Sequence, residues 1–109
     1  MERINIINVL KHVVVLLVNK NYDRLFLDDY LKEGEYEFLW KNIKDYGGQI
    51  TMPTEEALVE FDIYEKSDNS VGVDFNLWVD DKESDLTLQL DIIEKGEDYY
   101  YTIVDIHIL

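Results

Sequence analysis

Residues 71–92, VGVDFNLWVDDKESDLTLQLDI, decide the fold, because they contain two runs of alternating apolar and polar side chains. The run 71–79 has an aliphatic or aromatic residue at every odd position, and the run 85–92 has leucine or isoleucine at every even position. A period of two is typical of half-buried β-strands. Residues 80–84 between the runs favour a turn, so the stretch predicts an antiparallel hairpin with one aliphatic and one polar face.

Two further alternating segments flank this hairpin. Residues 59–64 precede it across a turn at 67–70, and residues 99–108 follow it across a turn at 94–97. Such short connections predict an antiparallel meander. In the last strand, the alternation predicts an aliphatic face with Tyr100, Thr102, Val104, Ile106 and Ile108, and a polar face with Tyr99, Tyr101, Ile103, Asp105 and His107.

The first half of the chain has helical spacing instead. Apolar residues at i, i+3, i+4 and i+7 predict a largely buried helix over residues 4–20, although the β-branched run 13–15 also allows a strand there. Further helices are expected over residues 22–31 and 35–46, the latter ending before Gly47, and Thr54 is suited to cap one more turn. Their expected inward-facing residues are Leu25, Phe26, Tyr30, Leu31, Phe38, Leu39, Trp40 and Ile43.

These patterns together predict the fold class and the domain organisation. We expect one α+β domain over residues 1–109, with about three N-terminal helices packed on one face of a C-terminal antiparallel β-meander of about three to four strands. Hydrophobic residues make up 47% of the chain, which argues against disorder. The sequence has no cysteine, so neither disulfides nor thiolate metal sites are available.

Charge is the strongest functional signal. Twenty-four acidic and ten basic residues produce a formal net charge of −14 at pH 7. Such a chain repels nucleic acids and anionic membranes, so we expect neither as a partner. The acidic excess serves either solubility alone or electrostatic complementarity to a basic protein. A monomer is the favoured oligomeric state.

No targeting or membrane-spanning segment is expected. The first residues lack a basic n-region, and Lys11 and His12 interrupt the apolar stretch that follows. The longest unbroken apolar run, residues 13–18, is far shorter than the ~20 residues that cross a bilayer. The lack of cysteine also suits a reducing compartment. We therefore expect a soluble cytoplasmic protein.

Catalytic and metal-binding motifs are not found. The acidic turn at residues 80–85 does not match a calcium-binding loop, because Leu86 stands where a loop starting at Asp81 requires glycine. His12 and His107 lie in no short-range ligand motif, and no serine lies in a nucleophile elbow. Glycine-rich loops of the kind that bind phosphate are also absent. We expect neither an enzyme nor a resident metal or cofactor.

The polar face of the predicted sheet is the candidate binding surface. It combines carboxylates with aromatic residues, which are enriched at the centres of protein interfaces. The alternative is that the helices of the first half cover these aromatic residues. The predicted partner-binding residues of this face and its turns are Asp74, Trp78, Asp80, Asp81, Glu83, Asp85, Asp91, Glu97, Asp98, Tyr99 and Tyr101.

The C-terminal third also resembles a known group of proteins. A Leu77-Trp78 strand leads through an acidic turn into Ser-Asp-Leu-Thr-Leu at residues 84–88, and the chain ends with Asp-Ile-His-Ile-Leu at 105–109. This pattern resembles small bacterial proteins, some of which are similar to immunity proteins of polymorphic toxin systems, including contact-dependent growth inhibition. The resemblance implies a stoichiometric inhibitor of a cognate toxin domain, often a basic nuclease.

Other functions remain open at this point. An acidic adaptor or regulatory module would bind a protein partner without protecting against a toxin. An enzyme of another class would need a pocket with convergent carboxylates around His107. A structural or self-associating role would appear as an oligomer in solution.

Overall fold

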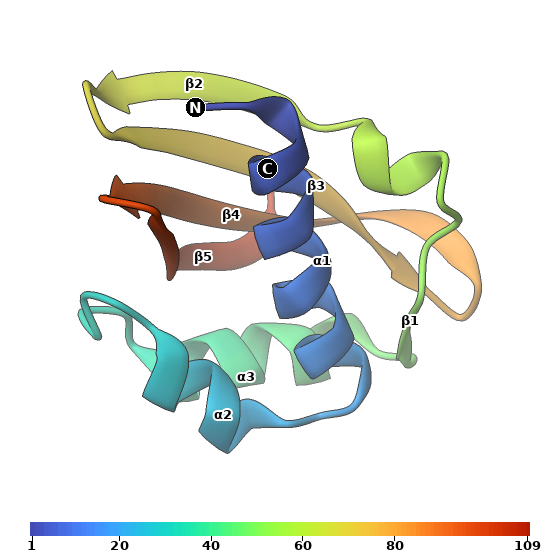
Figure 1. Ribbon diagram of the computed structural model, residues 1–109. Helices are drawn as coiled ribbons and strands as arrows, with labels where there is room; N and C mark the ends of the chain where they lie inside the picture. The colour runs from blue at the N-terminus through green and yellow to red at the C-terminus, as the bar shows by residue number, and fades with distance from the viewer.

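The computed structural model describes residues 1–109 and has the predicted α+β architecture (Figure 1). Three helices come first and an antiparallel sheet follows. The helices are α1 (Arg3–Val18), α2 (Tyr22–Asp28) and α3 (Tyr36–Tyr46), and a 3-10 turn covers Ala57–Val59. The strands are β1 (Ile50–Thr51), β2 (Asp62–Ser67), β3 (Ser70–Val79), β4 (Lys82–Lys95) and β5 (Asp98–Ile108).

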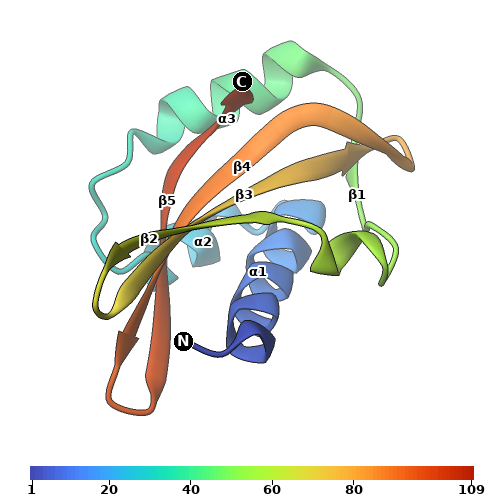
Figure 2. The ribbon, with the colours of Figure 1, turned by 90° about the horizontal axis from the view of Figure 1, so that it is seen from above.

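Helix α1 packs across the aliphatic face of the sheet, as its periodicity predicts (Figures 1 and 2). Ile6, Leu10, Val13, Val14 and Leu17 form its buried stripe. These positions are spaced by three or four residues, so they lie on one side of the helix. The helical pattern thus prevails over the low helix propensity of the valine run, because burial on the sheet outweighs a few tenths of a kcal/mol per residue.

Strands β2 to β5 form the predicted meander. Strand β3 pairs with β2 on one side and with β4 on the other, and β4 pairs with β5. The short strand β1, which the sequence pattern did not reveal, pairs with the far end of β3 through Ile50 and Thr51. The core contains the apolar residues of β3 and β4 that the alternation assigned to it, among them Val73, Phe75 and Leu88.

The β3–β4 hairpin turns through Asp80 and Asp81 alone, since Val79 pairs with Lys82. Both aspartates have positive φ, 51° and 65°. This is the type I′ geometry that matches the right-handed twist of a hairpin, and glycine is the residue that adopts it at least cost. The acidic turn is therefore shorter than the expected 80–84, and Ser84 lies within β4, where its hydroxyl donates to the Leu77 carbonyl at 2.6 Å.

Replacing Asp81 with glycine is expected to raise the free energy of unfolding by about 0.5–1 kcal/mol, because glycine removes the cost of the left-handed conformation. Urea denaturation measures the gain. Asp68→Gly is the matched control, since Asp68 lies in the β2–β3 turn and has no positive φ. A variant D81G no more stable than the parent would contradict the turn assignment.

Strand β5 departs from simple alternation. Gln89 pairs with Asp105, but the neighbouring Leu90 pairs with Ile103. Val104 is therefore an extra residue of β5 that has no partner on β4. This β-bulge reverses the inward and outward positions of the residues before it. Tyr101 and Ile103 consequently lie in the core together with Ile106, whereas Val104 is exposed. The predicted faces of Tyr99–Val104 are therefore wrong, and those of Asp105 to His107 hold.

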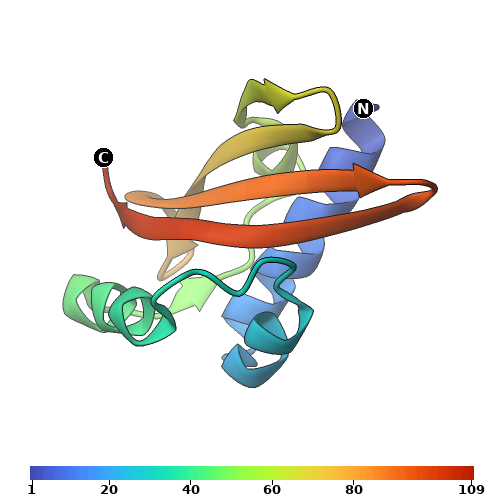
Figure 3. The same cartoon turned by 90° about the vertical axis from the view of Figure 1, so that its left-hand side faces the viewer.

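Figure 3 shows that the connection after α2 runs beside β5. Helix α2 ends at Asp28 instead of Leu31, because Asp29 adopts an extended conformation and pairs with β5. The Asp29 backbone forms a parallel bridge with Tyr101. The backbone amide of the next residue, Tyr30, donates to the Tyr101 carbonyl at 2.8 Å. The Asp29 carboxylate is fully buried and accepts from the Ile103 amide at 3.0 Å. The connection to α3 thus runs along the outer edge of β5.

Several aromatic and aliphatic residues expected inside lie at the surface. Phe26, Tyr30, Leu31 and Phe38 are all exposed. The early end of α2 moves Tyr30 and Leu31 out of the helix. In α3, Leu39 is buried as predicted, and Tyr36 rather than Phe38 is buried with it. Gly47 ends α3 with φ 85°, and Thr54 caps the 3-10 turn by accepting from the Ala57 amide at 3.1 Å, both as predicted.

None of the helices combines the length and the hydrophobicity that crossing a bilayer requires.

Candidate functional site

The polar face of the sheet is the side of β2 to β5 that points away from the hydrophobic core. Helix α3 lies along the edge of β5, where the Asn42 side chain donates to the Ile106 carbonyl at 2.9 Å, and does not cover this face. Asp62, Tyr64 and Asn76 are exposed on it. The alternation and the strand register place the following residues on this face: Asp62, Tyr64, Asp74, Asn76, Trp78, Glu83, Thr87, Gln89, Asp91, Thr102, Asp105 and His107.

A row of hydrogen-bonded side chains crosses the four long strands on this face. It begins at Tyr64 of β2, whose hydroxyl donates to Asp74 of β3. Gln89 of β4 donates through Nε2 to Asp74 Oδ1 at 3.2 Å, and its Oε1 lies 2.9 Å from His107 Nε2 on β5. The other imidazole nitrogen, Nδ1, lies 3.1 Å from Asp105 Oδ2. These contacts hold each side chain in one orientation across the sheet.

Hydrogen bonding to Asp74, followed by burial, raises the pKa of Tyr64 to about 12. The phenol therefore keeps its proton at neutral pH and acts as a donor. A side chain that gives its proton only at such high pH does not serve as a base or nucleophile near pH 7. Within the row, Tyr64 therefore serves as the hydrogen-bond donor to Asp74.

A second contact crosses the sheet over Gly72. Lys66 Nζ of β2 lies 3.1 Å from Asp91 Oδ1 of β4. A Cβ atom on Gly72 of β3 would come within 3.0 Å of both Lys66 Cε and Tyr64 Cδ2. The missing side chain therefore lets these two residues of β2 lie flat across β3. We expect a larger residue at position 72 to displace both.

Beside the row, carboxylates surround an open hollow of about 430 Å³. Glu60, Asp62, Asp74 and Glu83 line it, together with the C-terminal Leu109. Neither Glu60, Asp62 nor Glu83 forms an ion pair within the chain. The negative charge of this hollow is therefore available to a partner. No group of three or more histidine, cysteine or acidic side chains has an arrangement suited to a metal ion.

The predicted partner-binding residues do not form one patch. Asp74, Asp91, Trp78 and Glu83 share the polar face, and Trp78 pairs with Glu83 across the hairpin. The indole N–H of Trp78 is enclosed and has no hydrogen-bond partner. Glu97 and Asp98 are exposed at the β4–β5 hairpin, at the opposite end of the 14-residue strand β4.

Two of the predicted acidic residues have local structural contacts. Asp80 accepts from the Gln49 amide at 3.0 Å and donates its own amide to the Gln49 carbonyl at 2.8 Å, which ties the hairpin to the segment before β1. Asp85 accepts from the Tyr46 hydroxyl at 2.7 Å and so connects β4 to α3. The Asp81 side chain remains exposed.

The two predicted tyrosines do not lie on the polar face of the sheet. Tyr101 is buried, and its hydroxyl donates to the Leu25 carbonyl at 2.7 Å, so its assignment to the partner-binding face is wrong. The bulge at Val104 explains this error. Tyr99 is half-buried against α1, where its hydroxyl accepts from Asn5 at 2.9 Å and donates to Glu94 at 2.8 Å.

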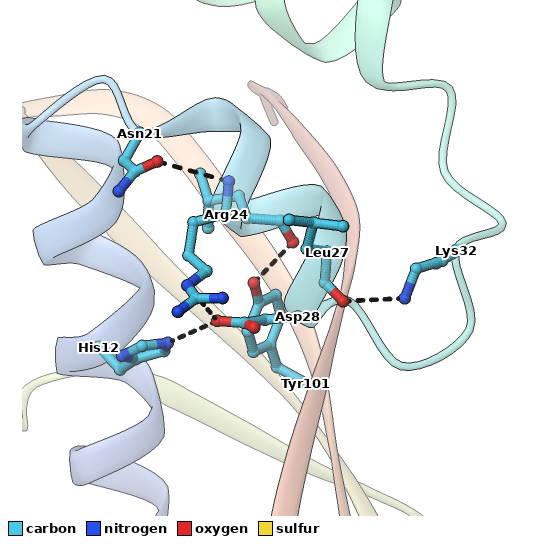
Figure 4. A network of polar contacts seen from close by, with 8 residues as sticks. His12, Asn21, Arg24, Leu27, Asp28, Lys32 and Tyr101 are labelled. Carbon is cyan, nitrogen blue, oxygen red and sulfur yellow. Dashed lines mark hydrogen bonds and ion pairs between the residues drawn. The ribbon is translucent and has the colours of Figure 1, made fainter.

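Another polar cluster lies between α1 and α2, on the helical side of the molecule (Figure 4). His12 Nε2 is 3.3 Å from Asp28 Oδ2, and Arg24 Nε is 3.9 Å from the same oxygen. These contacts lie beside the Tyr101 ring, whose centre is 6.2 Å from that of His12. Asp28 of α2 thus contacts both His12 of α1 and Arg24 of its own helix. Because the contact with His12 joins the two helices, the cluster holds α2 against α1.

The alternation of the sequence is consistent with Tyr64, Gln89 and His107 on the polar face but does not connect them. Their spacing in the chain has no motif, because each comes from a different strand. Sequence reasoning also overlooked Lys66, which neutralises Asp91. Only the register of the sheet brings these side chains within hydrogen-bond distance.

No curated protein and no solved structure matches this chain. One family model does match, over residues 14–109, which include all five strands, α2, α3 and part of α1. The protein therefore belongs to the family described as "Domain of unknown function (DUF7668)".

Proposed function

We propose that this protein binds and neutralises a basic bacterial toxin domain, in a stoichiometric complex through the polar face of the sheet. The observation that carries the proposal is the hollow lined by Glu60, Asp62, Asp74 and Glu83, in which none of the four carboxylates has a cationic partner within the chain. Lysine and arginine side chains complement such a surface. The resemblance of the C-terminal third to immunity proteins supports a toxin as the partner.

The distribution of charge supports the choice of face. Residues 60–109 hold fourteen of the twenty-four acidic residues but only three of the ten basic ones. These residues form β2 to β5. A field concentrated on one half of a molecule steers a basic partner to that half and raises the association rate.

The rigidity of the face supports tight binding. The row from Tyr64 to Asp105 holds its side chains on strands before any partner arrives. Groups that are already ordered lose less conformational entropy when a complex forms. Tyr64 and Trp78 add aromatic surface of the type that is common at interface centres.

The deciding experiment measures growth of cells that express the C-terminal domain encoded by the gene immediately upstream, with and without this protein. We expect growth to stop when the domain is expressed alone and to resume when the protein is added. Rescue without any complex between the two purified proteins would contradict direct neutralisation. A partner that binds but is harmless to cells would instead favour the adaptor function.

The double variant Asp62→Lys with Glu83→Lys is expected to weaken binding to that domain by about 100-fold or more at low salt, since each reversal replaces attraction by repulsion. Titration calorimetry at two salt concentrations measures the change. The matched control reverses Glu33 and Glu56, two exposed acidic residues outside the polar face. An equal loss in the control would show that only net charge matters and that the assigned face is wrong.

A further inference from the structure

Strand β2 leaves one side of its backbone without a partner. It pairs with β3 and with no other strand, and it lies at the margin of the sheet (Figure 1). All six of its residues are exposed. No backbone group from outside the sheet hydrogen-bonds to residues 62–67. We call the side of β2 that faces away from β3 the outer edge.

The opposite margin of the sheet is covered by the chain itself. The Tyr30 amide donates to the Tyr101 carbonyl of β5 at 2.8 Å, and the Asn42 side chain donates to the Ile106 carbonyl at 2.9 Å. The chain thus occupies the free side of β5, whereas the free side of β2 stays open. An unpaired strand edge is a template on which an extended segment adds a further strand.

The register of β3 indicates which of its backbone groups face β2. Just before β3, the Asn69 carbonyl accepts from the Glu94 amide of β4 at 2.8 Å. Successive backbone groups of a strand point to opposite sides, and the pairing of β3 with β4 has no shift between residues 70 and 76. The backbone groups of Gly72 and Asp74 therefore point away from β4 and toward β2.

The outer edge consequently presents the backbone groups of Ile63 and Glu65. Tyr64 and Asp62 lie directly opposite the two residues of β3 that face β2, so their N–H and C=O groups take part in the ladder with β3. The backbone groups of the alternate residues, Ile63 and Glu65, point outward and have no partner in the chain.

The side chains of β2 that could shield this edge lean the other way. Lysine on an edge strand is a common protection against pairing with another chain. Lys66, the one lysine of β2, reaches across β3 to β4, where its Nζ lies 3.1 Å from Asp91 Oδ1. The Tyr64 hydroxyl likewise donates inward, to Asp74 of β3. The outer edge is thus left uncovered.

The charge at the outer edge selects a basic partner. Residues 60–68 include four acidic side chains and one basic side chain. That single cation, Lys66, is already paired with Asp91. A second copy of this chain would bring the same acidic residues and a net charge of −14, so it would be repelled. An extended segment with lysine or arginine supplies both the backbone groups of a strand and the missing positive charge.

We propose that an extended basic segment of the partner binds to the outer edge of β2 as an additional antiparallel strand. The identity of the partner as a toxin domain rests on the proposed function, whereas the strand pairing follows from the edge itself. Antiparallel pairing continues the pattern of this sheet and is slightly more stable per residue than parallel pairing.

The alternation of the sheet specifies the pattern of this segment. Asp62 lies on the polar face, where it lines the hollow together with Glu60. The Ile63 side chain points to the opposite face and is 37% exposed. An added strand places every second side chain beside Asp62, where lysine or arginine fits, and the others beside Ile63, where an apolar side chain fits. The residues opposite Ile63 form the backbone hydrogen bonds with β2, since directly paired residues share a face.

A synthetic peptide of alternating lysine and valine is the probe that tests this pairing. Amide hydrogen exchange of the purified protein is followed by NMR with and without the peptide. We expect exchange at the Ile63 and Glu65 amides to slow by at least about tenfold when the peptide binds, because these amides become hydrogen-bonded. The Tyr64 amide, which already faces β3, should change little. A peptide that does not bind, or that binds without slowing these two amides, would overturn the proposal.

N-methylation of the peptide separates strand pairing from attraction by charge. The valine amides face β2 in the proposed register, so methyl groups on them should weaken binding by at least about tenfold. The matched peptide with methyl groups on its lysine amides has the same charge and should keep the affinity of the unmodified peptide. Equal affinities of the two methylated peptides would show that charge alone attracts them and that no strand is added.

Ile63→Pro tests the edge from the side of the protein. Proline lacks the outward N–H, and an edge strand tolerates it there because no bond to β3 is lost. This variant should bind the peptide at least about tenfold more weakly, whereas the control Ile63→Thr keeps the N–H and should bind like the parent. Circular dichroism checks that both variants are folded, and the exchange measurement on the unaltered chain decides the question if the proline variant is not. A folded Ile63→Pro with the affinity of the parent would contradict the edge.

The domain encoded upstream distinguishes failure of this inference from failure of the proposed function. A domain that is bound and neutralised without slower exchange at Ile63 and Glu65 would overturn the edge and leave the proposed function intact. Slower exchange with the peptide, together with no binding of the domain, would support the edge and contradict a toxin as the partner.

Discussion

Asp29→Ala is expected to lower the free energy of unfolding by about 3–5 kcal/mol, the range found when one partner is removed from a buried charged network. The Asp29 carboxylate is fully buried. It accepts hydrogen bonds from the Tyr36 hydroxyl, from Thr102 Oγ1 at 2.6 Å and from the Ile103 amide at 3.0 Å. The Lys32 amide donates to it as well, at 2.9 Å. Alanine leaves all four donors without an acceptor.

The loss is larger than a single contact suggests, because these donors come from three parts of the fold. Asp29 joins the connection after α2 to the first turn of α3 and to the middle of β5. We expect the melting temperature to fall by about 12 °C or more, since 1 kcal/mol corresponds to about 4–8 °C in a domain near this size. Urea denaturation followed by far-UV circular dichroism measures both quantities.

Asp28→Ala is the control for this variant. The neighbouring Asp28 is partly exposed and contacts His12 and Arg24 at 3.3 Å and 3.9 Å. Exposed ion pairs stabilise by about 0–1 kcal/mol, so the control should cost little. Similar losses of stability in both variants would contradict the role of Asp29 as the acceptor that joins these three parts of the fold. The loss of stability in Tyr36→Phe should lie between those of Asp28→Ala and Asp29→Ala, because this variant removes one donor and leaves the Asp29 carboxylate three others.

Alkaline pH is expected to unfold the protein through its buried tyrosines. Burial is the main cause that raises the pKa of Tyr36, with the hydrogen bond to Asp29 as the second cause. Burial also raises the pKa of Tyr101, and the charge of Asp28 adds to this effect. The folded chain therefore keeps these two phenolic protons at a pH where the unfolded chain releases them.

The sign follows from proton binding. Below the unfolded tyrosine pKa of about 10, both states hold these protons and the stability is fully present. Above it, the unfolded state lacks the two protons that Tyr36 and Tyr101 keep in the folded state, so these two residues lower the free energy of unfolding by about 2.7 kcal/mol per pH unit. A small domain with a stability of about 5–15 kcal/mol would lose much of it within two to three pH units.

Urea denaturation at a series of pH values between 9 and about 12 measures this slope. Tyr36→Phe and Tyr101→Phe should each reduce this slope by about 1.4 kcal/mol per pH unit, because each removes one linked proton. The control Leu39→Ala, at a buried position of α3 near Tyr36, should lower stability by a similar amount at every pH and leave the slope unchanged. A slope unaffected by both tyrosine variants would show that other groups cause alkaline unfolding.

The sequence by itself determined the fold class and the faces of the regular elements. The period of two in residues 71–92 placed Phe75 and Leu88 in the core, and the helical period did the same for Leu10 and Leu17. These predictions hold because the repeat of a helix or strand is a local property and burial is governed by the pattern of apolar residues. The net charge of −14 likewise follows from the sequence alone.

Only the tertiary structure decided where local rules are broken and which distant residues meet. The bulge at Val104 turned Tyr101 into the core, because one extra residue in a strand reverses alternation and composition does not reveal it. Asp29 ended α2 early because β5 offered its carboxylate buried donors. The row from Tyr64 to His107 depends on strand register, which long-range pairing sets. The local sequence thus determines which side chains share one face of a helix or strand. The pairing between strands determines which of these side chains lie close enough to form a site.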